Sequence, residues 1–294
     1  MSKINVIHFS PLTKIMLWRE NSIAAVGDWF NWSDQEDSLV KQLIKTARKE
    51  KKKSVIFVPI TDENMHGFLV EKNLTEKAGY YKVDEIFFYY LHQTMRLEDD
   101  MIVANLNQFL KIDHFLLSKN FQLDHVFNEK WLEEHQNERH TFVPTVSGDK
   151  YIAKVINSLN TCNFKLFKKL TFVDFMLEGR VAEGTKKART LGYPTANLKY
   201  DTKLPLKYGV YGVEVYIPHT DKTYNGYAFY ISLNNDEFFV FETNIEKFNT
   251  EIYGWKLVVT PKIFVRENVP YTTDQNMIKL IQEDINKIKS YSKG

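Results

Sequence analysis

The 294-residue sequence predicts two domains of different class, an α/β domain with a parallel sheet followed by a small all-β domain that ends in a helix. In the first half, short apolar runs alternate with amphipathic helical patterns, which is typical of a parallel sheet covered by helices. In the second half, strand-like runs follow one another at even spacing without intervening helices, which favours an antiparallel barrel. A chain of this length commonly holds two domains, and we expect them at residues 1–165 and 166–294.

Apolar runs mark the strands of the first domain. Ser54–Ile60 is apolar at nearly every position, as in a strand buried on both faces of a parallel sheet. Ahead of it, Leu39, Leu43 and Ala47 recur at helical spacing. Ser33 and Glu36 form the S-x-x-E pattern of a capping box, which predicts where this helix begins. The expected strands are Ile4–Phe9, Ile23–Val26, Ser54–Ile60, Glu85–Leu91 and Phe115–Leu117.

The second domain is expected to consist of strands joined by short turns. A final helix follows them, with Asp274 placed to cap it and an apolar stripe that would pack on the barrel. The stripe consists of Met277, Ile278, Ile281, Ile285 and Ile288. The expected strands are Phe172–Val181, Tyr208–Ile217, Lys222–Leu233, Glu237–Ile245 and Trp255–Arg266.

Composition narrows the possible partners and compartments. The net charge of +2 offers no bulk electrostatic case for a nucleic-acid partner. Cys162 is the single cysteine, so the chain cannot form an internal disulfide, which fits a reducing compartment. The sequence opens without a signal-peptide pattern and contains no apolar run of membrane-spanning length. We therefore expect a cytoplasmic protein without a membrane partner, and its oligomeric state stays open.

The segment Gly179–Leu198 carries the strongest chemical signal. Its glycines, Gly184 and Gly192, allow the backbone to approach a ligand closely or to adopt positive φ. Exposed backbone amides in such a loop can cradle phosphate oxygens. The side chains that would add positive charge for an anionic ligand are Lys186, Lys187 and Arg189.

The end of the same segment offers two neutral oxygen ligands. Thr195 and Asn197 are two residues apart and follow Pro194, which stiffens the turn. Two neutral oxygens together with substrate phosphates form a donor set that Mg²⁺ uses. We therefore expect Thr195 and Asn197 to bind Mg²⁺ together with the phosphates of a substrate.

Together, the pattern GRV-x-x-G and the following LGYPTAN resemble the signature of riboflavin kinases, which make FMN from riboflavin and ATP. In bacteria this module is usually the C-terminal half of a bifunctional FAD synthetase. The resemblance implies a six-stranded barrel, with ATP and riboflavin as substrates and Mg²⁺ as the metal. Ala188 stands where the family usually has another glycine, and Gly226–Ile231 departs from the family's usual strand sequence.

The resemblance also assigns a base. Glu242 lies in a strand followed by the turn Tyr253–Gly254, as does the family glutamate that takes the proton from the riboflavin 5′-hydroxyl. Apolar neighbours in the strand would raise the pKa of this carboxyl group, which suits general-base catalysis. The alternative interpretation is a surface carboxylate on an edge strand. Arg266 is expected to support the flavin or a lid over it.

In the N-terminal half, the resemblance to bacterial FAD synthetases is weaker, because several motif residues are replaced. Gly27 and Trp29 fit the family register, but Ser33 and Glu36 stand where two histidines handle ATP phosphates in adenylyl transfer. A carboxylate at this place would repel ATP. Two later family segments, at Leu117–Asp124 and Ser147–Ile152, are also altered. The substituted loop positions are Ser118, Asn120 and Asp124.

The sequence therefore favours a riboflavin kinase whose nucleotidyltransferase-type, Rossmann-like domain is inactive. One alternative is a full FAD synthetase that uses substitute residues in its first domain. The other is a flavin- or nucleotide-binding regulator without catalysis. The joint presence of Thr195, Asn197 and Glu242 speaks against the regulator, because binding alone does not need a base.

Overall fold

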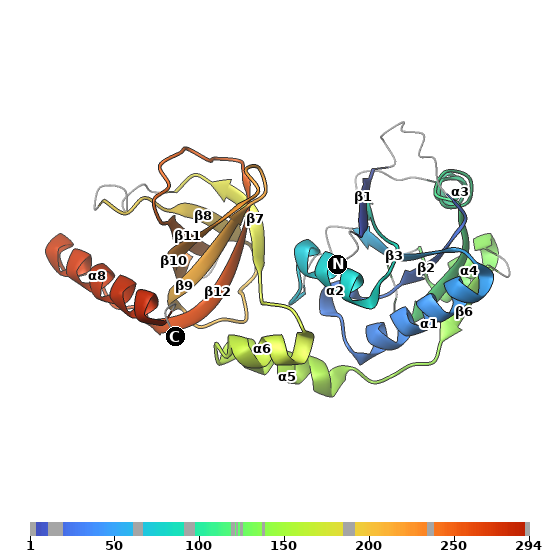
Figure 1. Ribbon diagram of the computed structural model, residues 1–294, viewed down its shortest axis with the longest axis horizontal. Coiled ribbons are helices and arrows are strands. Elements are labelled where there is room, and N and C mark those ends of the chain that lie inside the picture. Colours follow the sequence, from blue (N-terminus) through green and yellow to red (C-terminus); the bar gives the residue numbers. More distant parts are fainter. Residues whose placement is uncertain are drawn as a thin grey trace. The chain divides into compact units, whose positions relative to one another are not determined.

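The computed structural model describes residues 4–10, 20–60, 67–90, 98–118, 121, 123, 126–136, 139–184, 192–233 and 238–291. The chain forms two compact units, Met1–Ala153 and Lys154–Gly294, which are coloured along the sequence in Figure 1. The division falls within helix α5 (Asp149–Asn160), ahead of the boundary expected after residue 165. The two domain limits from the sequence remain a prediction.

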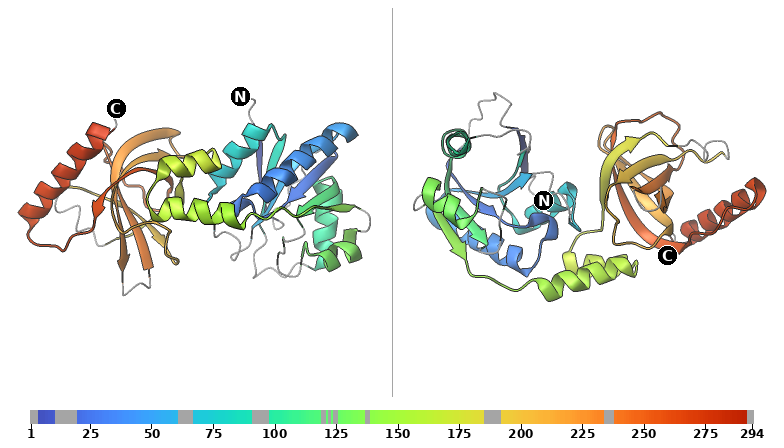
Figure 2. Two further views of the ribbon diagram at one scale, coloured as in Figure 1. Left: turned by 90° about the horizontal axis from the view of Figure 1, so that it is seen from below. Right: turned by 180° about the vertical axis from the view of Figure 1, so that it is seen from behind.

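The N-terminal unit is built on a six-stranded sheet with the order β1-β4-β3-β2-β5-β6, in which every neighbouring pair is parallel. Its strands are β1 (Asn5–Phe9), β2 (Ser22–Val26), β3 (Lys53–Ile60), β4 (Glu85–Tyr90), β5 (Ile112–Ser118) and β6 (His140–Val143). Its helices are η1 (Trp29–Asn31), α1 (Asp34–Glu50), α2 (Glu71–Tyr81), α3 (Asp99–Ala104), η2 (Asn105–Phe109) and α4 (Glu129–Gln136). Figure 2 shows the helices around this sheet from two further sides.

The expected strands of this unit are confirmed in kind and place, and the capping box is confirmed in detail. β2 and β3 occupy the centre of the sheet and are almost wholly buried, which explains their continuous apolar sequences. Helix α1 begins directly after Ser33, which caps it together with Glu36. Strand β6 was not predicted, because this short edge strand carries His140 and Thr141 and has no apolar run.

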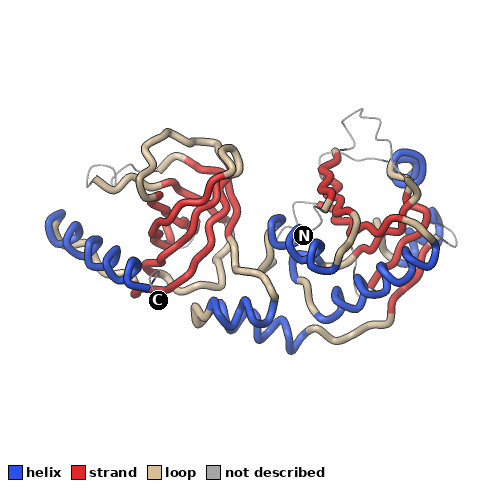
Figure 3. Tube along the Cα trace, viewed as in Figure 1, coloured by secondary structure: helices blue, strands red, loops and turns tan. Residues whose placement is uncertain are grey.

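The C-terminal unit is a closed barrel with the strand order β10-β11-β8-β7-β12-β9, and Figure 3 shows its strands in red. All of its neighbouring pairs are antiparallel. The strands are β7 (Leu177–Ala182), β8 (Ala196–Tyr200), β9 (Gly209–Ile217), β10 (Lys222–Leu233), β11 (Phe238–Ile245) and β12 (Lys256–Glu267). The six-stranded barrel expected from the resemblance is confirmed. Strand β8 was not among the five predicted runs, because its five residues include outward-facing Asn197 and Lys199.

Helices flank the barrel at both ends of its sequence. Helix α6 (Phe164–Thr171) precedes it, and α8 (Asp274–Tyr291) follows it and contacts β9 and β12. The expectation that Asp274 caps α8 is wrong, because Asp274 is its first residue and Asn276 N donates to Thr273 Oγ1 at 3.3 Å. The predicted apolar stripe is mostly half-buried, with Ile281 its one fully buried member.

Candidate active site

The side chains of Glu242, Asn197 and Phe229 lie together on the outer face of the barrel. Glu242 on β11 is the register partner of Asn197 on β8 and of Phe229 on β10. Directly opposite residues in antiparallel strands project from the same face. The alternate β11 residues Phe241 and Thr243 are completely buried toward the barrel interior, so Glu242 and its two partners lie outside.

Glu242 lies in a partly desolvated environment. It is half-buried, and desolvation raises the pKa of its carboxyl group above the ordinary value of 4.5. Because β11 lies between β10 and β8 in a closed barrel, the alternative of a carboxylate on an edge strand is wrong. A carboxylate with a raised pKa beside a substrate hydroxyl is a stronger base than an exposed one.

Asn197 combines burial with an unsatisfied oxygen. Its side chain is only 7% exposed, and its Oδ1 atom has no hydrogen-bond partner within the described residues. Gly184 packs directly on this amide, since a Cβ atom built at Gly184 would lie 1.6 Å from Asn197 Nδ2. The glycine is thus required for close approach at the position that the sequence assigned to phosphate binding.

The oxygen donors suit a hard divalent cation. Thr195 is half-buried and precedes β8 by one residue, so its hydroxyl and the orphaned oxygen of Asn197 come from the same short segment. Gly192, just before them, turns the chain with φ of +86°. These neutral oxygens fit a Mg²⁺ ion that takes its other ligands from phosphates and water. The predicted basic residues Lys186, Lys187 and Arg189 lie outside the described residues.

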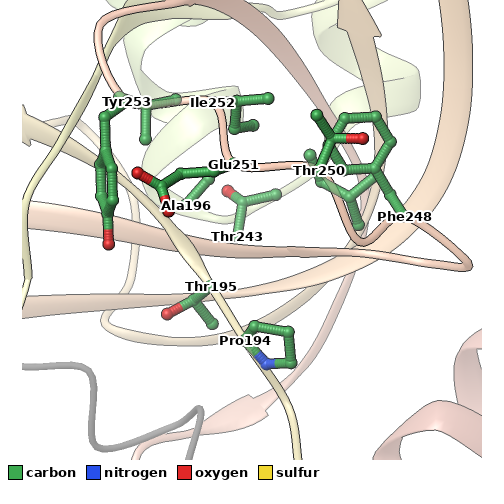
Figure 4. Close-up of a pocket in the computed structure, with 11 residues that line it drawn as sticks. Pro194, Thr195, Ala196, Thr243, Phe248, Thr250, Glu251, Ile252 and Tyr253 are labelled. Carbon is green, nitrogen blue, oxygen red and sulfur yellow. The ribbon is translucent and has the colours of Figure 1, made fainter.

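Beside this segment the barrel opens into a small pocket of about 60 Å³. Figure 4 shows Thr195, Thr243 and Glu251 among the side chains around it. Glu242 and Asn197 do not line it, because they project from the opposite face of their strands. The lining residues are Val181, Pro194, Thr195, Ala196, Thr243, Ile245, Phe248, Thr250, Glu251, Ile252 and Tyr253. Of these, sequence reasoning had assigned a role in binding to Thr195 alone.

Sequence analysis did not identify Thr243 as a candidate binding residue, although it directly follows Glu242 in the sequence. It is completely buried, and its hydroxyl oxygen has no hydrogen-bond partner among the described residues. A buried polar atom without a partner is unusual in a folded protein and commonly marks a binding site or an ordered water. The apolar strand pattern gave no sign that this inward position would carry one.

Arg266 lies on the same register row as Glu242 but three strands away, since Arg266 pairs with Val210 and Val210 pairs with Phe229. Its guanidinium donates to both carboxylate oxygens of Asp284 on α8, with the shortest N–O distance 2.7 Å. Asp284 is almost fully buried. The structure thus gives Arg266 a role in joining α8 to β12, and its predicted contact with a flavin remains a prediction.

In the N-terminal unit, the start of α1 is occupied by its own side chains. The Glu36 carboxylate accepts hydrogen bonds from Ser33 N at 2.9 Å and from Asp28 N at 3.3 Å. The Ser33 hydroxyl accepts from Gln35 N at 3.2 Å. Amides at a helix start ordinarily attract anions, but here the Ser33 amide donates to the Glu36 carboxylate and the Gln35 amide to the Ser33 hydroxyl. Burial raises the pKa of Glu36, with opposing hydrogen bonds from Ser33.

A second altered segment packs against this helix start. Val146 N donates to the side-chain oxygen of Gln35, and a Cβ atom at Gly148 would lie 2.6 Å from Ser33 Oγ. Only part of the third altered segment, Leu117–Asp124, lies within the described residues. Ser118 is buried at the end of β5, and Asn120 and Asp124 lie outside the described residues.

Two kinds of feature are absent from the described residues. These residues contain no group of three or more His, Cys, Asp or Glu side chains placed to hold a metal ion. No helix in the same set of residues has the length and apolar character needed to cross a membrane.

Comparison with known proteins agrees with the resemblance found in the C-terminal half of the sequence. Residues 172–292 match the family described as Flavokinase: Riboflavin kinase. The bifunctional riboflavin kinase/FMN adenylyltransferase of Mycoplasma pneumoniae is 33% identical over 118 residues, which cover 40% of this chain and 42% of that protein. The protein of the same name from Listeria monocytogenes is 30% identical over 115 residues, covering 37% and 36% of the two chains.

The match to the riboflavin kinase family thus covers the barrel and the helix that follows it, and leaves the N-terminal unit unmatched. The alignments span less than half the length of these curated relatives. A solved structure, titled a macrolide-efflux protein from Streptococcus pneumoniae, covers 97% of this chain and 99% of its own with a TM-score of 0.60. At 20% identity, this similarity concerns the fold alone.

Proposed function

We propose that this protein is a riboflavin kinase, which transfers the γ-phosphate of ATP to the riboflavin 5′-hydroxyl and releases FMN and ADP. The observation that carries the proposal is the placement of Glu242. This carboxylate, with its raised pKa, lies between Asn197 and Phe229 in a domain of the riboflavin kinase family. It can accept the hydroxyl proton as the oxygen attacks the γ-phosphate.

The neighbour of Glu242 on β10 offers a contact surface for the flavin. Phe229 is half-buried next to Glu242 and offers an apolar surface for the substrate beside the base. Arg266 lies three strands away along the same register row, on the opposite side of the six-stranded barrel from Glu242, so the role expected for it toward the flavin or a lid rests on the resemblance alone. Asp284 fixes the guanidinium, so its remaining donor capacity is preoriented.

ATP is proposed to bind from the other side of the 192–197 segment. Its phosphates would lie against the outer face at Asn197, next to Gly184. Gly184, Lys186, Lys187, Arg189 and Gly192 belong to the loop that would cover the phosphates. Mg²⁺, held by Thr195 and Asn197, would neutralise phosphate charge during the transfer.

We further propose that the N-terminal unit does not convert FMN to FAD. Adenylyl transfer requires stabilisation of negative charge on the α-phosphate and the departing pyrophosphate. The start of α1 instead presents the buried Glu36 carboxylate, whose hydrogen bonds use amides that a phosphate would need. The names of the bifunctional relatives support the alternative, a chain that carries out both reactions.

One pair of assays tests both proposals. Purified full-length protein is incubated with riboflavin, ATP and Mg²⁺, or with FMN, ATP and Mg²⁺, and the flavins are separated by chromatography. FMN should form in the first reaction, and no FAD should form in either. FAD appearing at a rate comparable with FMN would replace the second proposal with the bifunctional alternative. Binding of riboflavin or ATP without any turnover would favour a regulator instead.

A further inference from the structure

A side chain bridges the base-bearing strand to the turn that precedes Asn197. Asn244 Nδ2 donates to the Pro194 carbonyl oxygen at 2.8 Å. Asn244 follows Glu242 by two residues in β11, so both side chains project from the same outer face. The hydrogen bond therefore connects the strand of the proposed base with the segment that holds Thr195.

The hydrogen bond from Asn244 to Pro194 lies just beyond the last backbone pair between β11 and β8. The last register pair between β11 and β8 joins Thr243 to Ala196, and β8 begins at Ala196. Thr195 and Pro194 are consequently outside the ladder. The Asn244 amide takes the place of the next ladder bond by donating to the carbonyl group of Pro194.

A contact between two aromatic rings also holds the turn that precedes Thr195. The ring of Tyr193 lies 6.2 Å, between centroids, from the ring of Tyr227 on β10, in a steeply inclined arrangement. Tyr227 is nearly fully buried. The turn is thus held through Tyr193 on one side and through Pro194 on the other, and Thr195 follows directly.

From this geometry we infer that Asn244 is a positioning residue that holds Thr195 in place for the divalent cation and the ATP phosphates. The inference rests on the proposed kinase function. Misplacing a ligand by about 1 Å can reduce a reaction rate by roughly 10²-fold, because phosphoryl transfer depends mainly on positioning. Asn244 does not itself touch a reacting atom.

The test compares three full-length variants with the wild-type protein. Asn244→Leu keeps the branched shape but removes the donor, Asn244→Gln keeps an amide donor, and Asn225→Leu alters an exposed asparagine on the neighbouring strand β10 as a matched control. ADP binding is measured by calorimetry with and without Mg²⁺. FMN formation is measured across a Mg²⁺ titration and a riboflavin titration.

The inference predicts a selective loss of the metal response. Asn244→Leu should reduce the Mg²⁺-dependent gain in ADP affinity by about tenfold and raise the Mg²⁺ concentration for half-maximal activity by a similar factor. The KM for riboflavin should stay within about twofold, the unfolding temperature should shift by only a few degrees, and Asn244→Gln should recover most of the response.

The possible failures can be told apart. Wild-type protein that forms no FMN and shows no Mg²⁺-dependent ADP binding would overturn the function and the inference together. An active wild type and an Asn244→Leu variant with an unaltered Mg²⁺ response would overturn the inference alone. Equal losses in Asn244→Leu and Asn225→Leu, or a large fall in unfolding temperature, would show a general structural role in place of positioning.

Discussion

At the scale of the residue, the site depends on side chains whose surroundings change their chemistry. Glu242 would be an ordinary surface carboxylate on an open sheet edge, but closure of the barrel gives it neighbours on both sides. Asn197 is buried with an oxygen that the described part of the chain leaves unsatisfied. Both features arise from a few residues that pack closely around β8 and β11.

Replacement of Glu242 by Gln keeps the shape of the side chain and removes its basicity. We expect kcat to fall by about 10² to 10⁴, with riboflavin affinity little changed. Wild-type activity should rise with pH through the raised pKa of Glu242, and the variant should lose this limb of the pH profile. A variant with nearly wild-type kcat would show that Glu242 is not the base.

The same substitution should leave stability unchanged or increase it at neutral pH. A carboxyl group whose folded-state pKa lies above its unfolded value stabilises the fold below the unfolded pKa, and this contribution is lost as pH rises through the folded pKa. At pH 7 the buried charge is thus unfavourable, and Gln removes it. Thermal unfolding at pH 4 and pH 7 should show the variant gaining relative to wild type at the higher pH.

Gly184→Ala is expected to disturb the metal site without touching a functional group. The added Cβ would collide with the Asn197 amide at 1.6 Å, so the loop or the amide must shift. We predict a weaker Mg²⁺ response in FMN formation, resembling that of Asn197→Ala. Gly179→Ala is the matched control, because its Cβ would meet only Leu198 at 3.4 Å or more. Equal behaviour of the two alanine variants at 184 and 179 would contradict the role given to Gly184.

At the scale of the element, helix α8 is held to the barrel by charge as well as by apolar contacts. The Arg266 and Asp284 side chains are 17% and 2% exposed, and they form a bidentate pair. Ile281 is the buried apolar residue one turn earlier. The helix pattern indicated the apolar stripe but not a buried carboxylate within it.

Asp284→Ala should therefore destabilise the C-terminal unit strongly. Removing one partner of a buried ion pair leaves the other charge uncompensated, which typically costs about 3 to 5 kcal/mol. Glu283→Ala is the control, because Glu283 is exposed and adjacent in sequence. Denaturant unfolding of both variants measures the difference in free energy of unfolding. A shift no larger than that of Glu283→Ala would show that the pair contributes little.

At the scale of the whole molecule, the two compact units differ in architecture and in the state of their candidate sites. The parallel sheet of the first unit has a helix start that its own Glu36 occupies. The barrel of the second unit contains the described residues proposed for phosphoryl transfer. This separation predicts that catalysis resides in the second unit alone.

A fragment beginning at Lys154, the first residue of the second unit, should fold and form FMN from riboflavin and ATP. Its kcat should lie within a fewfold of that of the full chain, because each proposed catalytic or binding residue belongs to it. A second fragment starting at residue 166 tests the boundary expected from the sequence. A folded but inactive Lys154 fragment, beside an active full-length protein, would show that the first unit is needed for catalysis.

The sequence by itself determined the local features of this protein. Apolar periodicity located nearly all strands and the helices α1 and α8, and the Ser33–Glu36 capping box was recognisable because its four residues are contiguous. The short polar strands β6 and β8 were not predicted, because they lack an apolar run. Tertiary structure alone decided which distant residues meet: Glu242 with Asn197, Asn244 with Pro194, and Arg266 with Asp284. Those contacts follow from strand register, barrel closure and the packing of α8 on β12, which depend on contacts across 18 to 50 residues of chain and leave no periodic signal in the sequence.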